Sequence, residues 1–229
     1  FYAVAEHVGE ISLRRPFFPF RNGAKGEIKQ AQLVSGLGVA DMDALRRRCE
    51  FDEHGKRGAT PLFWTIGPAQ VGKAAIGFWR DVLGPALRAD QASVWPFQGD
   101  LGGLARVGRV AVAETYPGEI YHWLDLSIIK PRRRKGRQED RADDAERMIA
   151  RGVRLKAHFS EAALAQIRSG FPDGKDDAFD AMVGLLGLLM VVEGKRAPGA
   201  PYDEEVRRIE GWILGRRASD IGRPPKRLE

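Results

Sequence analysis

Residues 107–118 read VGRVAVAETYPG, and this stretch decides the fold class. Its alternating β-branched residues predict a buried strand over 107–114, and the Thr-Tyr-Pro-Gly that follows predicts a turn. A short helix is expected next, over 118–126. Because a strand here alternates with helices, the sequence favours a layered α/β fold over a helical bundle or a β-sandwich.

The sequence on either side is expected to be mostly helical. Apolar spacing and capping residues predict helices over 41–50, 71–87, 139–151, 160–169 and 176–193. Pro85 should end or kink the second of these helices, and Ser160 should cap the fourth. Residues 9–26 mix Pro, Gly, Arg and Phe, which predicts a long irregular segment such as a lid or a binding loop.

The overall composition is that of a folded, soluble protein. The 229 residues are 43% apolar and 30% charged, which is too hydrophobic for a disordered chain and shows no collagen or disulfide-scaffold bias. The longest uncharged apolar run, 181–192, has 12 residues where a membrane span needs about 20, so we expect no transmembrane segment. The single cysteine, Cys49, cannot form an internal disulfide, which fits a reducing cytoplasm.

Acidic residues open the last predicted helix, whose other faces are almost all apolar. Asp177 and Asp180 are three residues apart, which places their side chains on one helical face about 5–6 Å apart, close enough to share a divalent cation. Capping of the helix N-terminus explains Asp176 and Asp177 equally well without a metal. Asp180 lies a turn further in, so we expect it to be the more buried acid and to be paired or coordinated.

Glu114 ends the predicted strand, at the edge where open α/β sheets place their ligand crevices. A glutamate in this position is often merely solvated. Together with Asp177 and Asp180, however, it would supply a third oxygen ligand, a set that suits Mg²⁺ or Mn²⁺. We therefore predict Glu114, Asp177 and Asp180 as the catalytic and metal-binding residues of a two-metal phosphodiesterase, with converging carboxyl groups.

The positive charge is concentrated in one segment, residues 130–137 (KPRRRKGR), which we call the basic loop. It carries six positive and no negative residues, while the whole chain has a net charge of +6, so the remainder is neutral. A surface for phosphates and a solvated loop without a partner are both open. The candidate nucleic-acid-binding residues are Lys130, Arg132, Arg133, Arg134, Lys135 and Arg137.

A second phosphate-related pattern lies at residues 67–73, where GPAQVGK matches G-x-x-x-x-G-K. Ala74 replaces the hydroxyl residue that would ligate Mg²⁺, and Pro68 removes an amide that could cradle phosphate. Three interpretations stay open: a nucleotide-binding loop, a contact of Gln70 and Lys73 with a nucleic-acid phosphate, and a plain turn into a core helix.

Four segments, taken in order, resemble the predicted RNase H-like nucleases known as domain of unknown function 429. They are FWTIGPAQVGKAA (63–75), VAVAETYP (110–117), DDAFDAM (176–182) and EGWIL (210–214). The D-A-x-D-A pattern over 177–181 also resembles the final helix of Holliday-junction resolvases. The resemblance implies an RNase H-like core over 106–195, a helical and loop-rich insertion over 1–105, and an extension with a basic tail over 196–229.

The resemblance carries the family's strand glutamate onto Glu114 and its helix carboxylates onto Asp177 and Asp180. The superfamily's first strand bears an Asp, and nothing upstream of Phe1 supplies it, so we expect the chain to begin partway through the domain and to show no robust nuclease activity alone. The expected function is a metal-dependent nuclease acting on DNA or RNA. The alternatives are a noncatalytic nucleic-acid-binding or regulatory module of the same fold and a nucleotide-binding protein.

Overall fold

The computed structural model describes residues 8–10, 30–51, 58–62, 71–106, 108–172 and 175–217. These residues divide into two compact units. Unit 1 contains the described residues up to Val112 together with Glu204–Gly211, and unit 2 contains Ala113–Asp203 together with 212–217. The described part of the chain is mixed α/β and mostly helical, as the sequence predicts at this coarse level.

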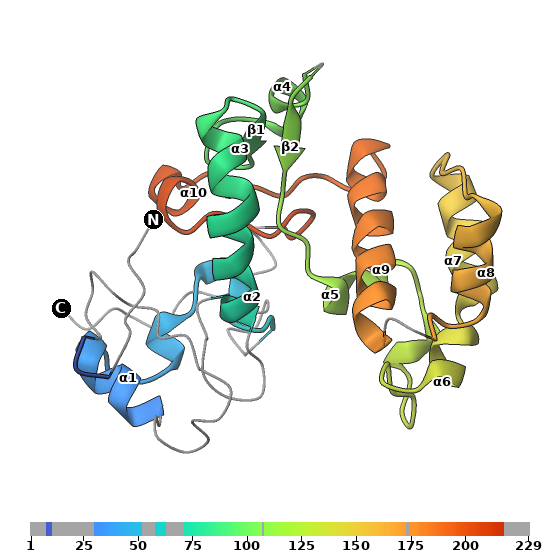
Figure 1. The fold of residues 1–229 in the computed structure, drawn as a ribbon, viewed down its shortest axis with the longest axis horizontal. Helices are drawn as coiled ribbons and strands as arrows, with labels where there is room; N and C mark the ends of the chain where they lie inside the picture. The colour runs from blue at the N-terminus through green and yellow to red at the C-terminus, as the bar shows by residue number, and fades with distance from the viewer. Residues whose placement is uncertain are drawn as a thin grey trace. The chain divides into compact units, whose positions relative to one another are not determined.

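Unit 1 holds a small parallel sheet and short helices (Figure 1). Strands β1 (Ala92–Val94) and β2 (Val110–Val112) pair in parallel, with Ala92 opposite Val110 and Val94 opposite Val112. The strand predicted over 107–114 is therefore present, although its regular pairing covers only the middle. The described helices of the unit are α1 (Gln30–Leu37), α2 (Val71–Phe78), α3 (Gly84–Arg88), α4 (Leu101–Leu104) and α10 (Glu204–Ile209), with a short 3₁₀ turn at Val8–Glu10.

Two helix predictions in unit 1 need correction. The helix expected over 41–50 is instead two 3₁₀ turns, Asp43–Leu45 and Arg48–Glu50, because the Glu50 carboxylate takes the Arg47 N–H and holds Arg47 extended. The helix expected over 71–87 continues to Arg88, but a π-helical turn at Trp79–Leu83 separates α2 from α3. Pro85 lies in the first turn of α3, where its ring crowds the preceding turn and favours this widening.

Unit 2 packs helices around α9 (Lys175–Val192), the longest described helix (Figure 1). Around it lie α5 (Pro117–Trp123), a 3₁₀ turn (Ser127–Ile129), α6 (Gln138–Ala142), α7 (Ala145–Arg154) and α8 (Glu161–Arg168). Contacts of α9 with α5 and α7 enclose an apolar core that includes Ile120, Met148, Phe179, Val183 and Leu186. A Cβ atom on Gly187 would lie 2.4 Å from Ile120 Cδ1, so only glycine lets α5 approach α9 so closely.

Side-chain hydrogen bonds set the helix ends in unit 2. The helix predicted over 139–151 is divided into α6 and α7, and at the division buried Asp144 accepts hydrogen bonds from the N–H groups of Ser127 (2.6 Å) and Ile128 (3.0 Å). Ser160 caps α8 as predicted, because its Oγ accepts the Ala163 N–H at 3.2 Å. None of the described helices is long and apolar enough to cross a membrane.

The last three residues of the EGWIL segment, 212–214, lie in unit 2 next to the end of the predicted strand. Trp212, Ile213 and Leu214 are buried. Ile213 forms an isolated parallel bridge with Glu114, and the Leu214 N–H donates to the Glu114 carbonyl at 2.8 Å. The backbone of Glu114 is thus held in an extended, strand-like pairing.

Candidate nucleic-acid interface

The basic loop and the start of α9 meet through one lysine. Lys135 Nζ lies 2.7 Å from Asp180 Oδ2 and 3.1 Å from Asp176 Oδ2. Asp176 and Asp180, which we call the acid pair, are four residues apart and therefore lie one helical turn apart on the same face. Two carboxylates of α9 thus converge on a single positive charge.

A tyrosine completes this cluster from the opposite side of Asp180. The Tyr121 hydroxyl donates a hydrogen bond to Asp180 Oδ1. Burial, followed by this hydrogen bond to a carboxylate, raises the pKa of Tyr121, so the phenol stays protonated as a donor. A hydrogen bond from Lys135 lowers the pKa of Asp176. Partial burial works against the charged form of Lys135, but its hydrogen bonds to the acid pair raise its pKa overall.

The structure places the predicted acids differently from the sequence interpretation. Asp177 is exposed, whereas the Asp180 side chain retains only 24% of its exposure, so the predicted order of burial is confirmed. The carboxylate that joins Asp180 on one cation is Asp176, which the sequence assigns to capping. Among the residues that the structure describes, no three His, Cys, Asp or Glu side chains form a group that could hold a metal ion. Glu114, Asp177 and Asp180 are therefore not found as one such group, and a metal site formed by them stays a prediction.

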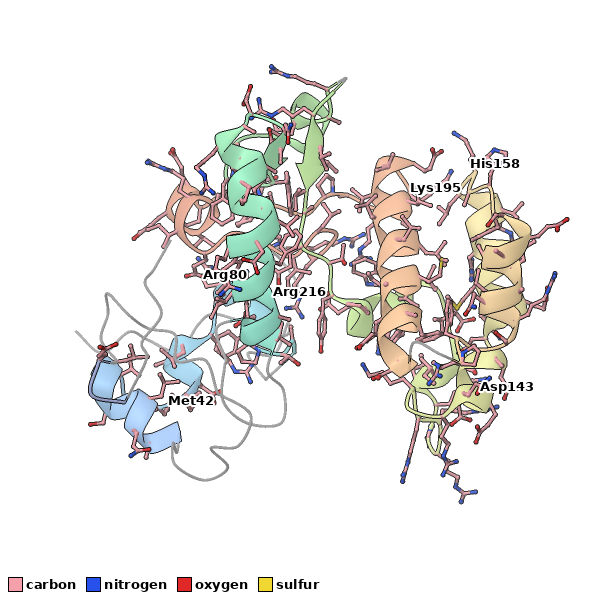
Figure 2. All side chains as sticks on the ribbon, viewed as in Figure 1. Met42, Arg80, Asp143, His158, Lys195 and Arg216 are labelled. Carbon is pink, nitrogen blue, oxygen red and sulfur yellow. The ribbon has the colours of Figure 1, made fainter. Side chains whose placement is uncertain are left out.

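A second pair of acids shapes the middle of the basic loop. Arg133 forms ion pairs with Asp140, at 2.8 Å, and with Asp143, which is labelled in Figure 2. Asp140 is buried and also accepts the Arg134 N–H at 2.9 Å. The hydrogen bond from Arg133, followed by that from the Arg134 backbone, lowers the pKa of Asp140. The carboxylate therefore stays charged and fixes the loop backbone.

Buried Arg141 holds the backbone of the basic loop by hydrogen bonds. Its guanidinium donates to the carbonyls of Lys135 (2.5 Å), Gly170 (2.8 Å) and Phe171 (3.3 Å). These bonds join the loop to the segment between α8 and α9. The basic loop is thus an organised structural element, with a defined backbone held by Asp140 and Arg141.

The other cations of the loop point into solvent. Within the described residues they have no side-chain hydrogen bond or ion pair, and all of them are exposed: Lys130, Arg132, Arg134 and Arg137. Arg132 has a left-handed backbone, with φ of 71°, at the turn of the loop. The site therefore offers four uncommitted positive charges on a fixed backbone.

Other sequence predictions fall outside the described residues. Gln70 and most of residues 9–26 lie there. Lys73 is placed in α2 by its backbone, but its side chain lies outside the description. Both phosphate contacts at the G-x-x-x-x-G-K pattern therefore stay predictions.

Sequence reasoning missed three side chains of this interface, Tyr121, Asp176 and Arg141. The spacing of Asp176 and Asp180 was a usable signal, because acids four residues apart share a helix face. Nothing in the local sequence marks Tyr121 or Arg141. Tyr121 lies 59 residues from Asp180, and Arg141 lies 29 and 30 residues from Gly170 and Phe171.

Comparisons with protein-family models, with curated proteins and with solved structures gave no significant match. The resemblance to RNase H-like nucleases therefore stays a prediction from sequence motifs.

Proposed function

We propose that this protein binds nucleic acid, and that the basic loop contacts the phosphate backbone. The observation that carries this proposal is the set of exposed, uncommitted cations on a backbone fixed by Asp140 and Arg141. Phosphodiester groups are the natural partners of such a set, because several closely spaced cations release condensed counterions from the polyanion. Contacts of this kind position a nucleic acid without reading its bases, so little sequence preference is expected.

The anchoring of the loop favours binding over simple solvation. A purely solvated loop needs no buried aspartate and no buried arginine beneath it, whereas a binding loop gains affinity when its backbone is ordered in advance. Asp140 and Arg141 both lie under the loop and both are buried. This arrangement reduces the ordering entropy that a flexible basic segment would lose on contact with phosphate.

Removal of exposed arginines from the loop tests the proposal. The triple variant Arg132→Ala, Arg134→Ala and Arg137→Ala should bind labelled duplex DNA more weakly. The slope of log K against log salt should also become shallower by about 2.7, or about 0.9 for each lost phosphate contact. Fluorescence anisotropy over a salt series measures both quantities.

A matched control separates the loop from net charge. The variant Arg147→Ala, Arg154→Ala and Arg168→Ala removes the same charge from exposed positions on α7 and α8 and should leave the slope unchanged. Equal losses in both triple variants would show that binding depends on overall charge, and the proposal for the loop would then be wrong.

A second candidate function, metal-dependent phosphodiester hydrolysis on an RNase H-like fold, is favoured by the acid pair. Among the described residues the three predicted ligands are not found as one group, but Asp176 and Asp180 converge on one cation, the Lys135 ammonium. Mg²⁺ is often bound through one or two carboxylates, with waters and substrate phosphates completing its shell. Asp176 and Asp180 would hold such an ion in place of Lys135, and the ion would polarise a phosphoryl oxygen.

Metal titration tests this candidate independently of activity. Calorimetry with Mn²⁺ should show tighter binding to Lys135→Met, which lacks the competing ammonium, and no binding to Asp180→Asn. Asp177→Asn, at the exposed neighbouring acid, serves as the control and should resemble the unaltered protein. Binding that survives Asp180→Asn but is lost in Asp177→Asn would contradict this assignment. Assays of labelled DNA and RNA with Mg²⁺ or Mn²⁺ show whether bound metal leads to cleavage.

A further inference from the structure

The six cations of the basic loop fall into two classes. Arg133 and Lys135 each contact two carboxylates, Asp140 with Asp143 and Asp176 with Asp180. The other four are exposed and have no ion pair with a described residue. The sequence alone treats all six as equivalent, because they share residue type and neighbourhood.

We infer that the acid pair withholds Lys135 from the nucleic acid, so that the loop binds phosphates through Lys130, Arg132, Arg134 and Arg137 only. This inference rests on the proposed nucleic-acid binding and assigns which cations take part. Lys135 is then a positioning residue, which joins the loop to α9 and does not contact the ligand.

Local electrostatics support the assignment of Lys135. Two carboxylates face one ammonium, so the cluster as a whole is negative and repels an approaching phosphate. The acid pair is fixed at the start of a helix, and Tyr121 holds Asp180 in place through a hydrogen bond. A phosphate would therefore have to replace two preorganised carboxylates in order to reach Lys135.

Arg133 is withheld in the same way. Its side chain retains 34% of its exposure and is paired with both Asp140 and Asp143, again two negative charges against one positive charge. Asp140 in addition fixes the Arg134 backbone. Release of Arg133 to a phosphate would therefore loosen the loop that presents the neighbouring arginines.

The two possible roles of Lys135 predict different salt dependences. Binding through four cations gives a slope of about 3.6 on duplex DNA, whereas a fifth contact through Lys135 would give about 4.5. Lys135→Met should leave the slope unchanged, because no phosphate contact is lost. The double variant Asp176→Asn and Asp180→Asn should bind more tightly and steepen the slope by about 0.9, because Lys135 is released to the ligand.

The decisive measurement is a three-variant cycle on one duplex, in EDTA, by fluorescence anisotropy across a salt series. Adding Lys135→Met to the Asp176→Asn, Asp180→Asn background should remove the extra slope. Asp177→Asn, which removes a neighbouring carboxylate that does not contact Lys135, should leave the slope unchanged. Asp176→Asn alone preserves the Tyr121–Asp180 hydrogen bond and provides a milder version of the same test if the double variant folds poorly.

Two results would overturn the inference. A slope shallower by about 0.9 in Lys135→Met alone would show that Lys135 already contacts phosphate. A steeper slope in the acid-pair variant that persists when Lys135 is also replaced would show a general effect of lost negative charge. Both differ from failure of the proposed function, in which the triple arginine variant of the loop binds as well as the unaltered protein.

Discussion

Each unit contains a carboxylate-cation cluster, and the two clusters differ in exposure. In unit 1, Glu50 is fully buried and lies 2.8 Å from the Nε of Arg47, which is also buried. In unit 2, Lys135 lies at the same kind of distance from Asp180, but its side chain retains 44% of its exposure. A carboxylate-cation contact is therefore fully buried in unit 1 and partly exposed to water in unit 2.

The two clusters also differ in the groups that surround them. The Glu50 carboxylate also accepts the N–H groups of Arg47 (3.0 Å) and Leu62 (2.7 Å), and Arg47 donates to the Glu210 carbonyl at 3.3 Å. All of these contacts lie within unit 1, and those with Leu62 and Glu210 join segments that are 12 and 163 residues apart in sequence. Lys135 instead belongs to a loop with four exposed cations beside it. The comparison indicates that the first cluster joins segments of unit 1, whereas the second holds the basic loop against α9.

The largest expected difference between the clusters is in stability. Glu50→Ala removes a buried carboxylate that pairs with Arg47 and accepts three hydrogen bonds, which should lower the free energy of unfolding by about 3–5 kcal/mol. The exposed Arg80–Asp81 pair of the same unit provides the control, because Asp81→Ala should leave the urea midpoint unchanged. If Glu50→Ala and Asp81→Ala had the same urea midpoint, the proposed difference in stability between buried and exposed ion pairs would be wrong.

How far the sequence predicts this contrast depends on the sequence separation of the partners. The need of Asp180 for a partner follows from its place one turn inside an apolar helix, and the structure supplies two partners. Their identity does not follow, because Tyr121 and Lys135 lie 59 and 45 residues away in the chain. The sealed pair is less predictable still, since Arg47 and Glu50 lie in a segment whose acids and bases resemble an exposed helix.

The same limit applies to the fold. Strand β2, the Ser160 cap and the extent of α9 follow from local patterns, and the structure contains all three. The two 3₁₀ turns around Arg47 do not follow from local patterns. There, hydrogen bonds to the Glu50 side chain replace the backbone hydrogen bonds of the expected helix. The contacts of the acid pair also depend on tertiary placement, which brings Lys135 to Asp176 and Asp180.

The smallest expected effect is in proton binding, where the two clusters should respond in opposite directions. Burial raises the pKa of Glu50 above its ordinary value of 4.5, and the Arg47 charge offsets this only in part. The hydrogen bond from Lys135 lowers the pKa of Asp176 below its ordinary value of 3.8. Glu50 therefore contributes stability that is present below its unfolded pKa and is lost as pH rises through its folded pKa. Asp176 contributes stability that is present above its unfolded pKa and is lost as pH falls through its folded pKa.

Carboxyl NMR titration of the unaltered protein and of Lys135→Met measures these shifts directly. Replacement of Lys135 should return the pKa of Asp176 toward 3.8, because the hydrogen bond that favours its charged form is gone, while the pKa of Glu50 stays raised. Because Asp176 is partly exposed, solvent screening keeps the accompanying change in stability small. An Asp176 pKa that stays unchanged in Lys135→Met would mean that Lys135 does not hold its contact with Asp176 in solution. Lys135 would then be available to phosphate, and the two clusters would differ in whether the ion pair forms in solution as well as in burial.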